Sequence, residues 1–183
     1  MSQQQESLNR RIVVGVDGSP SSKTALIWAL RQAKLTGASV EAVIAWHLPV
    51  AAGGIPFVPA GTMIGADFED VARMVLTAAI TEAVDPASEI KISSTVVGGN
   101  PAQVLLEAAK GAELLVVGNR GHGGFAGALL GSVSQHCAHH APCPLVIVRE
   151  PRAGGPVIRR DQLAIRGRLA ATGGWPQRGR RVR

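Results

Sequence analysis

Short apolar runs alternate along this chain with longer stretches whose apolar residues recur at helical spacing. The runs occupy residues 12–16, 40–46, 90–97, 114–117 and 145–148. Nearly continuous runs of this length are typical of strands buried on both faces of a sheet. Between them, residues 21–36, 67–84, 101–109 and 132–141 show helical periodicity or helix-start signals. We expect Ser21 or Ser22 to cap the first helix, Gly37 to end it, and Pro101 to begin the third.

This alternation of strands and helices predicts the α/β fold class. The expected architecture is an open five-stranded parallel sheet with right-handed crossovers, covered by helices on both faces. Ligands of such sheets bind outside the carboxyl ends of the strands. Residues at or just past the carboxyl ends of four of the strands are therefore expected to gather at one site, and these are Asp17, Ala45, Gly99 and Gly118.

Composition and charge divide the chain into a globular part and a basic tail. Apolar residues make up 46% of the 183 residues and charged residues 17%, which suits a buried core. The net charge of +6 is concentrated in residues 151–183, which hold nine of the 19 basic residues and one acidic residue, Asp161. We predict a flexible N-terminus (1–9), one domain (10–150) and a disordered Arg/Gly-rich tail (151–183). The Gly/Pro-rich connection at 47–65 is either a lid or simply mobile.

Cysteine use and the apolar stretches favour a cytoplasmic protein. Two cysteines, Cys137 and Cys143, are too few for a disulfide framework, and the first residues lack the apolar segment of a secretory signal. The uncharged stretch 42–66 contains three prolines and four glycines, so it cannot form an unbroken spanning helix. We expect a reducing cytoplasmic setting and no membrane partner.

The segment GNRGHGGFAGALLGS, residues 118–132, leaves one apolar run and enters a helix. Glycines let backbone amides approach an anion, and the start of a helix attracts negative charge, so phosphate is the expected occupant. Ser132 and Gln135 also fit a capping box. The segment lacks the lysine of a Walker A loop. It matches a dinucleotide fingerprint only formally, because it follows the fourth strand and no acidic residue lies about twenty positions on.

The spacing of Gly118, Gly121, Gly131 and Ser132 reproduces G-2x-G-9x-G-[S/T], and here the chain resembles the universal stress protein family. The opening VVGVDGS, the segment GNPA at 99–102 and the segment APCPLVIV at 141–148 also resemble that family's motifs, in the same order. The resemblance covers about residues 9 to 150. It implies a five-stranded fold of order 3-2-1-4-5 that binds ATP and forms homodimers through the last strand, Leu145–Val148.

The resemblance also implies roles for individual residues. Val16 and Asp17 would meet the ribose and adenine, with the Asp17 carboxylate accepting from ribose hydroxyls or approaching an ATP-bound Mg²⁺. Ala45 would offer backbone groups to the adenine, and Val117 and Gly118 would line the same pocket. The phosphates would be surrounded by Gly121, Gly131, Ser132, Val133 and Ser134. Arg120 would add charge-assisted contacts, and His122 lies near the same loop.

Other interpretations of these residues stay open at this point. Asp17 could merely cap the entry to the first helix. His136, Cys137, His139, His140 and Cys143 suggest a metal site, but their pairs face different sides of one helix, so we expect no metal held by the protein alone.

No catalytic constellation is evident, which favours a nucleotide-responsive regulatory module over an enzyme. A slow ATPase or a cyclic-nucleotide binder is the alternative. Nucleic-acid binding through the basic tail is less favoured, because only Trp175 could stack on a base there.

Overall fold

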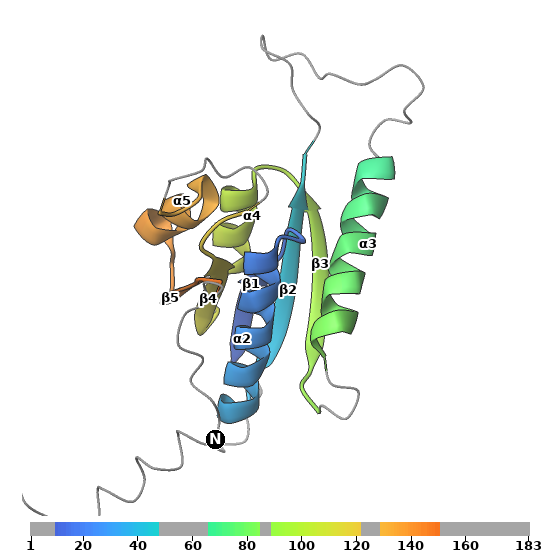
Figure 1. Cartoon of the computed structure of the whole chain (residues 1–183). Coiled ribbons are helices and arrows are strands. Elements are labelled where there is room, and N and C mark those ends of the chain that lie inside the picture. The colour runs from blue at the N-terminus through green and yellow to red at the C-terminus, as the bar shows by residue number, and fades with distance from the viewer. Residues whose placement is uncertain (1–9, 48–65, 85–88, 122–128, 151–183) are drawn as a thin grey trace, which may run out of the picture. The chain divides into compact units, whose positions relative to one another are not determined.

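The structure is a computed structural model that describes residues 10–47, 66–84, 89–121 and 129–150. The expectations for residues 1–9, for most of 47–65, for His122 and for the tail 151–183 lie outside these ranges. The described elements are β1 (Arg11–Gly15), α2 (Pro20–Thr36), β2 (Ser39–Trp46), α3 (Ala66–Ala83), β3 (Ile92–Gly98), α4 (Pro101–Ala108), β4 (Leu114–Gly118), α5 (Ser132–His140) and β5 (Leu145–Val148) (Figure 1).

The strands form one parallel sheet in the order β3-β2-β1-β4-β5, which confirms the expected fold class and strand order. β1 lies at the centre, with Val14 opposite Ala42 of β2 and Val116 of β4. The chain changes direction across the sheet between β1 and β4, which is the switch point where open α/β sheets bind ligands. The fold therefore places the carboxyl ends of β1, β2 and β4 side by side.

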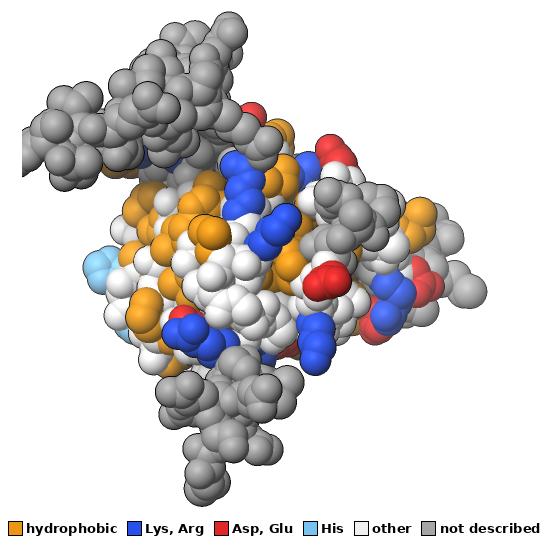
Figure 2. Space-filling model, turned by 90° about the horizontal axis from the view of Figure 1, so that it is seen from below, with side chains coloured by type: hydrophobic (Ala, Val, Ile, Leu, Met, Phe, Trp, Pro, Cys, Tyr) orange, Lys and Arg blue, Asp and Glu red, His pale blue; other side chains and the backbone are white. Residues whose placement is uncertain are grey.

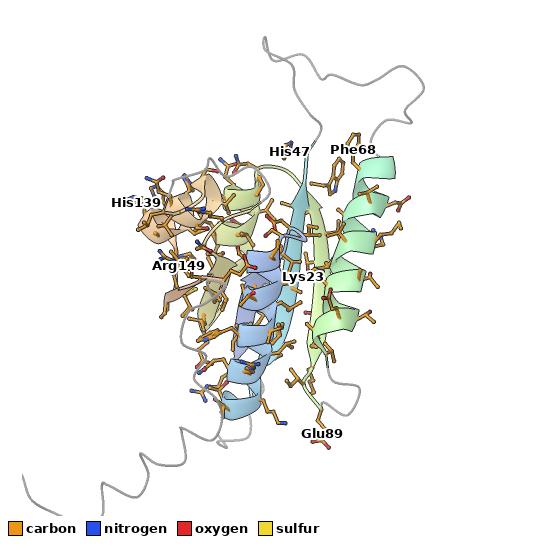
Figure 3. The ribbon with its side chains drawn as sticks, in the orientation of Figure 1. Lys23, His47, Phe68, Glu89, His139 and Arg149 are labelled. Carbon is orange, nitrogen blue, oxygen red and sulfur yellow. The ribbon has the colours of Figure 1, made fainter. Side chains whose placement is uncertain are left out.

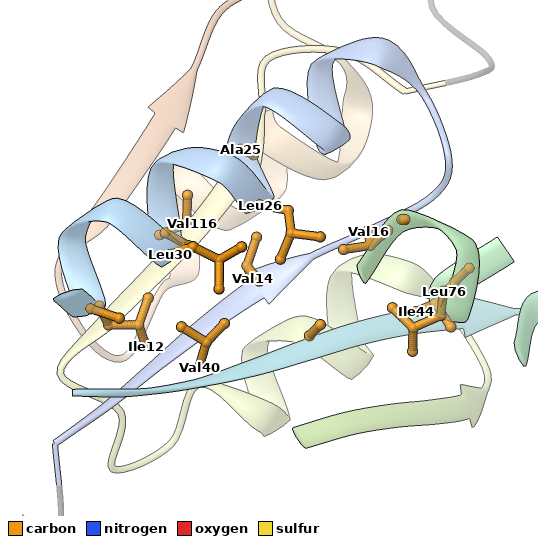
Figure 4. Packing of buried hydrophobic residues seen from close by; sticks show 14 of the residues in the cluster. Ile12, Val14, Val16, Ala25, Leu26, Leu30, Val40, Ile44, Leu76 and Val116 are labelled. Atoms are coloured by element: carbon orange, nitrogen blue, oxygen red, sulfur yellow. The ribbon is translucent and has the colours of Figure 1, made fainter. Parts of the chain in front are cut away.

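Two apolar clusters fill the two faces of the sheet, because successive side chains of a strand point to opposite faces. Ile12 and Val14 of β1 pack with Leu26 and Leu30 of α2 (Figure 4). α3 adds to this first cluster. Val13 of β1 belongs instead to the second cluster, with residues of α4 and Cys137 of α5. The near-continuous apolar runs in the sequence are explained by this double coverage.

The helix ends agree only in part with the sequence. Gly37 ends α2 in the left-handed region at φ 74°, and Pro101 begins α4, as expected. The prediction for the start of α2 is wrong, because the N-cap is Ser19, whose side chain accepts from the Ser22 amide. Pro20 explains the difference, since proline is favoured as the first helical residue and places the cap directly before itself.

The buried face of α3 is also shifted from the expected one. In the sequence, Phe68, Val71, Val75 and Ala78 or Ala79 recur in helical register over residues 67–84, which predicts that they share one face. Ala79 is buried as expected and Val75 packs partly buried against the first cluster, but the other buried side chains are Ala72 and Leu76, and Val71 is 57% exposed. In this helix apolar residues lie on more than one face, so periodicity alone could not choose between adjacent faces.

Arg11 joins three elements at the amino ends of the strands. Its guanidinium donates to Glu41 of β2 and to the carbonyls of Ala108 (3.0 Å) and Lys110 (2.9 Å) at the end of α4. Glu41 also accepts from Thr95 of β3 at 2.8 Å. Elsewhere on this face of the molecule basic and acidic side chains are interspersed (Figure 2).

None of the helices in the described ranges has the length and apolar content needed to cross a bilayer.

Candidate functional site

A cavity of about 480 Å³ opens at the carboxyl ends of β1, β2 and β4. Its volume lies in the range of small-molecule sites, about 300–1,000 Å³. The eleven residues to which the family resemblance assigned a role all line it: Val16, Asp17, Ala45, Val117, Gly118, Arg120, Gly121, Gly131, Ser132, Val133 and Ser134. The fold thus brings together residues that are up to 118 positions apart in the chain.

Six further lining residues were not foreseen: Gly15, Ser22, Val43, His47, Pro101 and Leu105. Val43, Ala45 and His47 follow one another at a spacing of two, the repeat with which side chains of a strand share a face. This two-residue period in the sequence could have identified His47 as a further candidate for the site. His47 lies at the end of β2 (Figure 3). Gly99, which was expected at the site, is not among the lining residues, and Pro101 at the start of α4 lines the cavity instead.

The turn after β1 fixes the carboxylate of Asp17. Asp17 Oδ1 accepts from the amide of Ser19 at 2.9 Å, and the amide of Asp17 donates to Ser22 Oγ at 3.3 Å. Asp17 therefore shapes the entry to α2 without being its N-cap. Its second oxygen, Oδ2, lies against the α-carbon of Gly121, where a Cβ would stand only 2.3 Å away.

The end of β4 and the residue that follows it make hydrogen bonds with α5 and β5. The Gly118 carbonyl accepts from Ser134 Oγ at 2.6 Å. The Asn119 amide donates to Val148 of β5 at 2.7 Å, and the Asn119 carbonyl accepts from the Gly131 amide at 2.8 Å. These bonds place Gly118 and Asn119 beside the first turn of α5.

α5 begins differently from the other helices at this end of the sheet. Side chains cap α2 and α4, where Ser19 and Asn100 accept from first-turn amides. The N-cap of α5 is Gly131, and no side chain caps its amides within the described chain. The predicted capping box is therefore wrong, because Ser132 is the first helical residue and not the cap. The first-turn amides of α5 line the cavity together with the exposed Ser132 side chain.

The His and Cys residues of α5 do not assemble a metal site among the described residues, where no group of three or more potential ligands is found. The His136 and His140 rings lie 4.5 Å apart. Cys137 is fully buried, and burial raises the pKa of its thiol. Burial also raises the pKa of Cys143, opposed by a hydrogen bond with the Leu115 backbone and by the charge of Arg11. Both cysteines are free thiols that pack in the second cluster.

An open α/β sheet with a glycine-rich cavity at its switch point defines a class of small-ligand binding domains. The sequence profile of the universal stress protein family matches residues 8–149. A universal stress protein of Mycolicibacterium smegmatis is 36% identical over 138 residues, which are 75% of this chain and 45% of that protein. One from Mycobacterium tuberculosis is 34% identical over 142 residues, 76% of this chain and 45% of that protein. The chain belongs to the universal stress protein family.

Solved structures agree with the fold. A universal stress protein from Archaeoglobus fulgidus superposes with a TM-score of 0.57 at 20% identity, covering 79% of this chain and 97% of the other. A family member from Arabidopsis thaliana, solved with AMP bound, gives 0.50 at 19% identity, covering 81% and 97%. The chain spans less than half the length of the two mycobacterial relatives.

Proposed function

We propose that the chain is an ATP-binding regulatory module that acts as a homodimer in the cytoplasm. The observation that carries this proposal is the convergence of all eleven candidate residues on one cavity of nucleotide size. These residues come from β2, β4, α5 and the segments that follow β1 and β4, so only the folded sheet brings them together.

The lining of the cavity offers suitable groups for both halves of a nucleotide. Val16, Val43, Leu105 and Val117 supply apolar surface for the base. Arg120, Ser132 and the first-turn amides of α5 supply donors for the phosphates. Ser134 is 3% exposed and its hydroxyl donates to Gly118, so Ser132 is the serine that offers its hydroxyl to a ligand.

Asp17 is the acidic residue of the cavity lining that suits Mg²⁺. Mg²⁺ is usually held by one or two carboxylates together with substrate phosphates. Asp17 would hold a Mg²⁺ bound to ATP, or else accept from the ribose hydroxyls. The metal would neutralise phosphate charge, while the protein's own groups orient the nucleotide.

Homodimerisation through β5 (Leu145–Val148) is supported by the position of that strand. β5 pairs with β4 on one side and forms an edge of the described sheet on the other. An edge strand exposes unpaired amides and carbonyls, which pairing across a two-fold axis would satisfy. Light scattering should give twice the chain mass of 19.0 kDa, and a monomer would refute the dimer.

The substitution Ser132→Asp tests the phosphate site without weakening the helix. A carboxylate in the first turn of α5 favours the helix electrostatically but repels a bound phosphate. Calorimetry should show at least tenfold weaker ATP binding at an unchanged or raised melting temperature, while the neutral control Ser132→Asn stays within about threefold of wild type. Equal ATP affinity in Ser132→Asp would refute phosphate binding at α5.

A slow ATPase or a cyclic-nucleotide binder would use the same cavity. A thermal-shift panel of ATP, ADP, AMP and cyclic AMP ranks them, because the stabilisation rises with affinity. The largest shift with ATP supports the proposal. The largest shift with cyclic AMP supports the alternative, and no shift with any of the four refutes the nucleotide site.

A further inference from the structure

Ser21, in the first turn of α2, makes hydrogen bonds with the backbone of Arg120, in the segment that follows β4. Ser21 Oγ donates to the Arg120 carbonyl and accepts from the Arg120 amide at 3.3 Å. Ser19 Oγ adds a longer bond of 3.4 Å to the same carbonyl. Ser21 is only 5% exposed, so its hydroxyl is held within the protein.

The close approach of Ser21 depends on Gly118. A Cβ at position 118 would stand 2.3 Å from Ser21 Oγ and 2.8 Å from the Ser21 carbonyl carbon. The glycine at 118 therefore lets the end of β4 and the first turn of α2 lie in contact. Bonds with Ser134, Val148 and Gly131 hold the same segment against α5 and β5, while Ser21, together with the longer bond from Ser19, holds it against the start of α2.

These bonds act on Arg120, the residue directly before Gly121. Fixing the Arg120 peptide sets the direction of the Arg120 side chain and holds Gly121 against Asp17 Oδ2. Arg120, Gly121 and Asp17 all line the cavity, but Ser21 does not. We infer that Ser21 is a positioning residue, which holds the Arg120–Gly121 segment in the geometry that receives the phosphates of a nucleotide.

The inference rests on the proposed function, and a comparison of ATP with adenosine separates the two. Ser21→Ala removes the hydroxyl and keeps a residue that helices favour. It should weaken ATP binding about three- to tenfold, while adenosine, which has no phosphates, stays within about twofold of wild type. Thr24→Ala is the matched control, because the Thr24 hydroxyl donates to the Pro20 carbonyl in the same part of α2 and, among the described residues, makes no bond to the segment 118–121. Its ATP affinity should equal that of wild type.

A second measurement needs no ligand. The Arg120 amide donates to Ser21 Oγ, so in Ser21→Ala this amide should exchange its hydrogen faster than in wild type or in Thr24→Ala. Unchanged ATP affinity, an equal loss for ATP and adenosine, or unchanged exchange at Arg120 would each overturn the positioning role. Wild-type protein that binds neither ligand would refute the proposed function itself, and the role in phosphate binding with it, whatever the exchange result.

Discussion

The α-carbon of Gly121 lies against the carboxylate of Asp17, where a Cβ at position 121 would stand 2.3 Å from Asp17 Oδ2. Because Asp17 Oδ1 is bound to the Ser19 amide, the carboxylate has little freedom to move away. The pair joins the turn after β1 to the segment after β4, the two strands at the switch point. A glycine is required at 121 for this contact.

Gly121→Ala should therefore weaken nucleotide binding by displacing Asp17. We expect at least fivefold lower ATP affinity by calorimetry. Gly37→Ala is the control, because Gly37 has φ 74° with nothing within 4 Å of an added Cβ, far from the cavity. It should lower the free energy of unfolding by about 1 kcal/mol and leave ATP affinity unchanged. If Gly121→Ala kept wild-type ATP affinity while Gly37→Ala lost it, the contact between Gly121 and Asp17 would have no role in binding.

Asp17→Asn separates the charge of this residue from its turn-forming role. The amide oxygen of asparagine can still accept from the Ser19 amide, so the turn and the melting temperature should be kept. The loss of the negative charge should lower the affinity for Mg²⁺-ATP tenfold or more, as for a hydrogen bond or metal contact of a charged group. Titration with Mg²⁺-ATP measures the affinity, and a wild-type value would contradict a role for the charge of Asp17 in binding Mg²⁺-ATP.

Arg11→Ala should destabilise the fold more than Arg10→Ala. Arg11 bonds to Glu41, whose side chain is 15% exposed, and to two carbonyls at the end of α4. Its loss leaves these partners unsatisfied at a cost of about 2–3 kcal/mol. Arg10 pairs with Glu113 at 3.2 Å on the surface, and its loss should cost under about 1 kcal/mol. Urea unfolding compares the two, and equal losses would contradict this account of Arg11.

The free energy of unfolding should fall in alkaline solution through Cys137. Burial raises the pKa of this thiol in the folded state, so the unfolded chain loses the proton first as the pH rises. The contribution is complete below the ordinary thiol pKa of about 8.5 and is lost as the pH rises towards the folded value. Urea unfolding between pH 7 and 10 should show that the free energy of unfolding falls less with rising pH in Cys137→Ala than in wild type. Parallel curves for the two proteins would contradict the prediction.

Sequence patterns were sufficient for the sheet because each strand is buried on both faces. The run 145–148 matches β5 (Leu145–Val148), and the other strands differ from their expected bounds by one or two residues. The helix details were harder, because Pro20 moves the cap of α2 to Ser19 and α3 carries apolar residues on several faces. At the start of α2 several residues could cap the helix, and on α3 several faces could be buried. Tertiary packing decides which of these alternatives forms.

The sequence by itself determined the fold class and the family, and it marked eleven residues that line one cavity. Burial on two faces leaves the apolar runs that predict the fold class, and the motif spacing carries the resemblance to the family, which in turn implied the eleven residues. Only the tertiary structure decided that Gly131 caps α5, that His47 faces the cavity, and that Ser21 holds the Arg120 peptide. Those relationships join residues from different elements, and their distances are set by how helices and strands pack rather than by spacing along the chain.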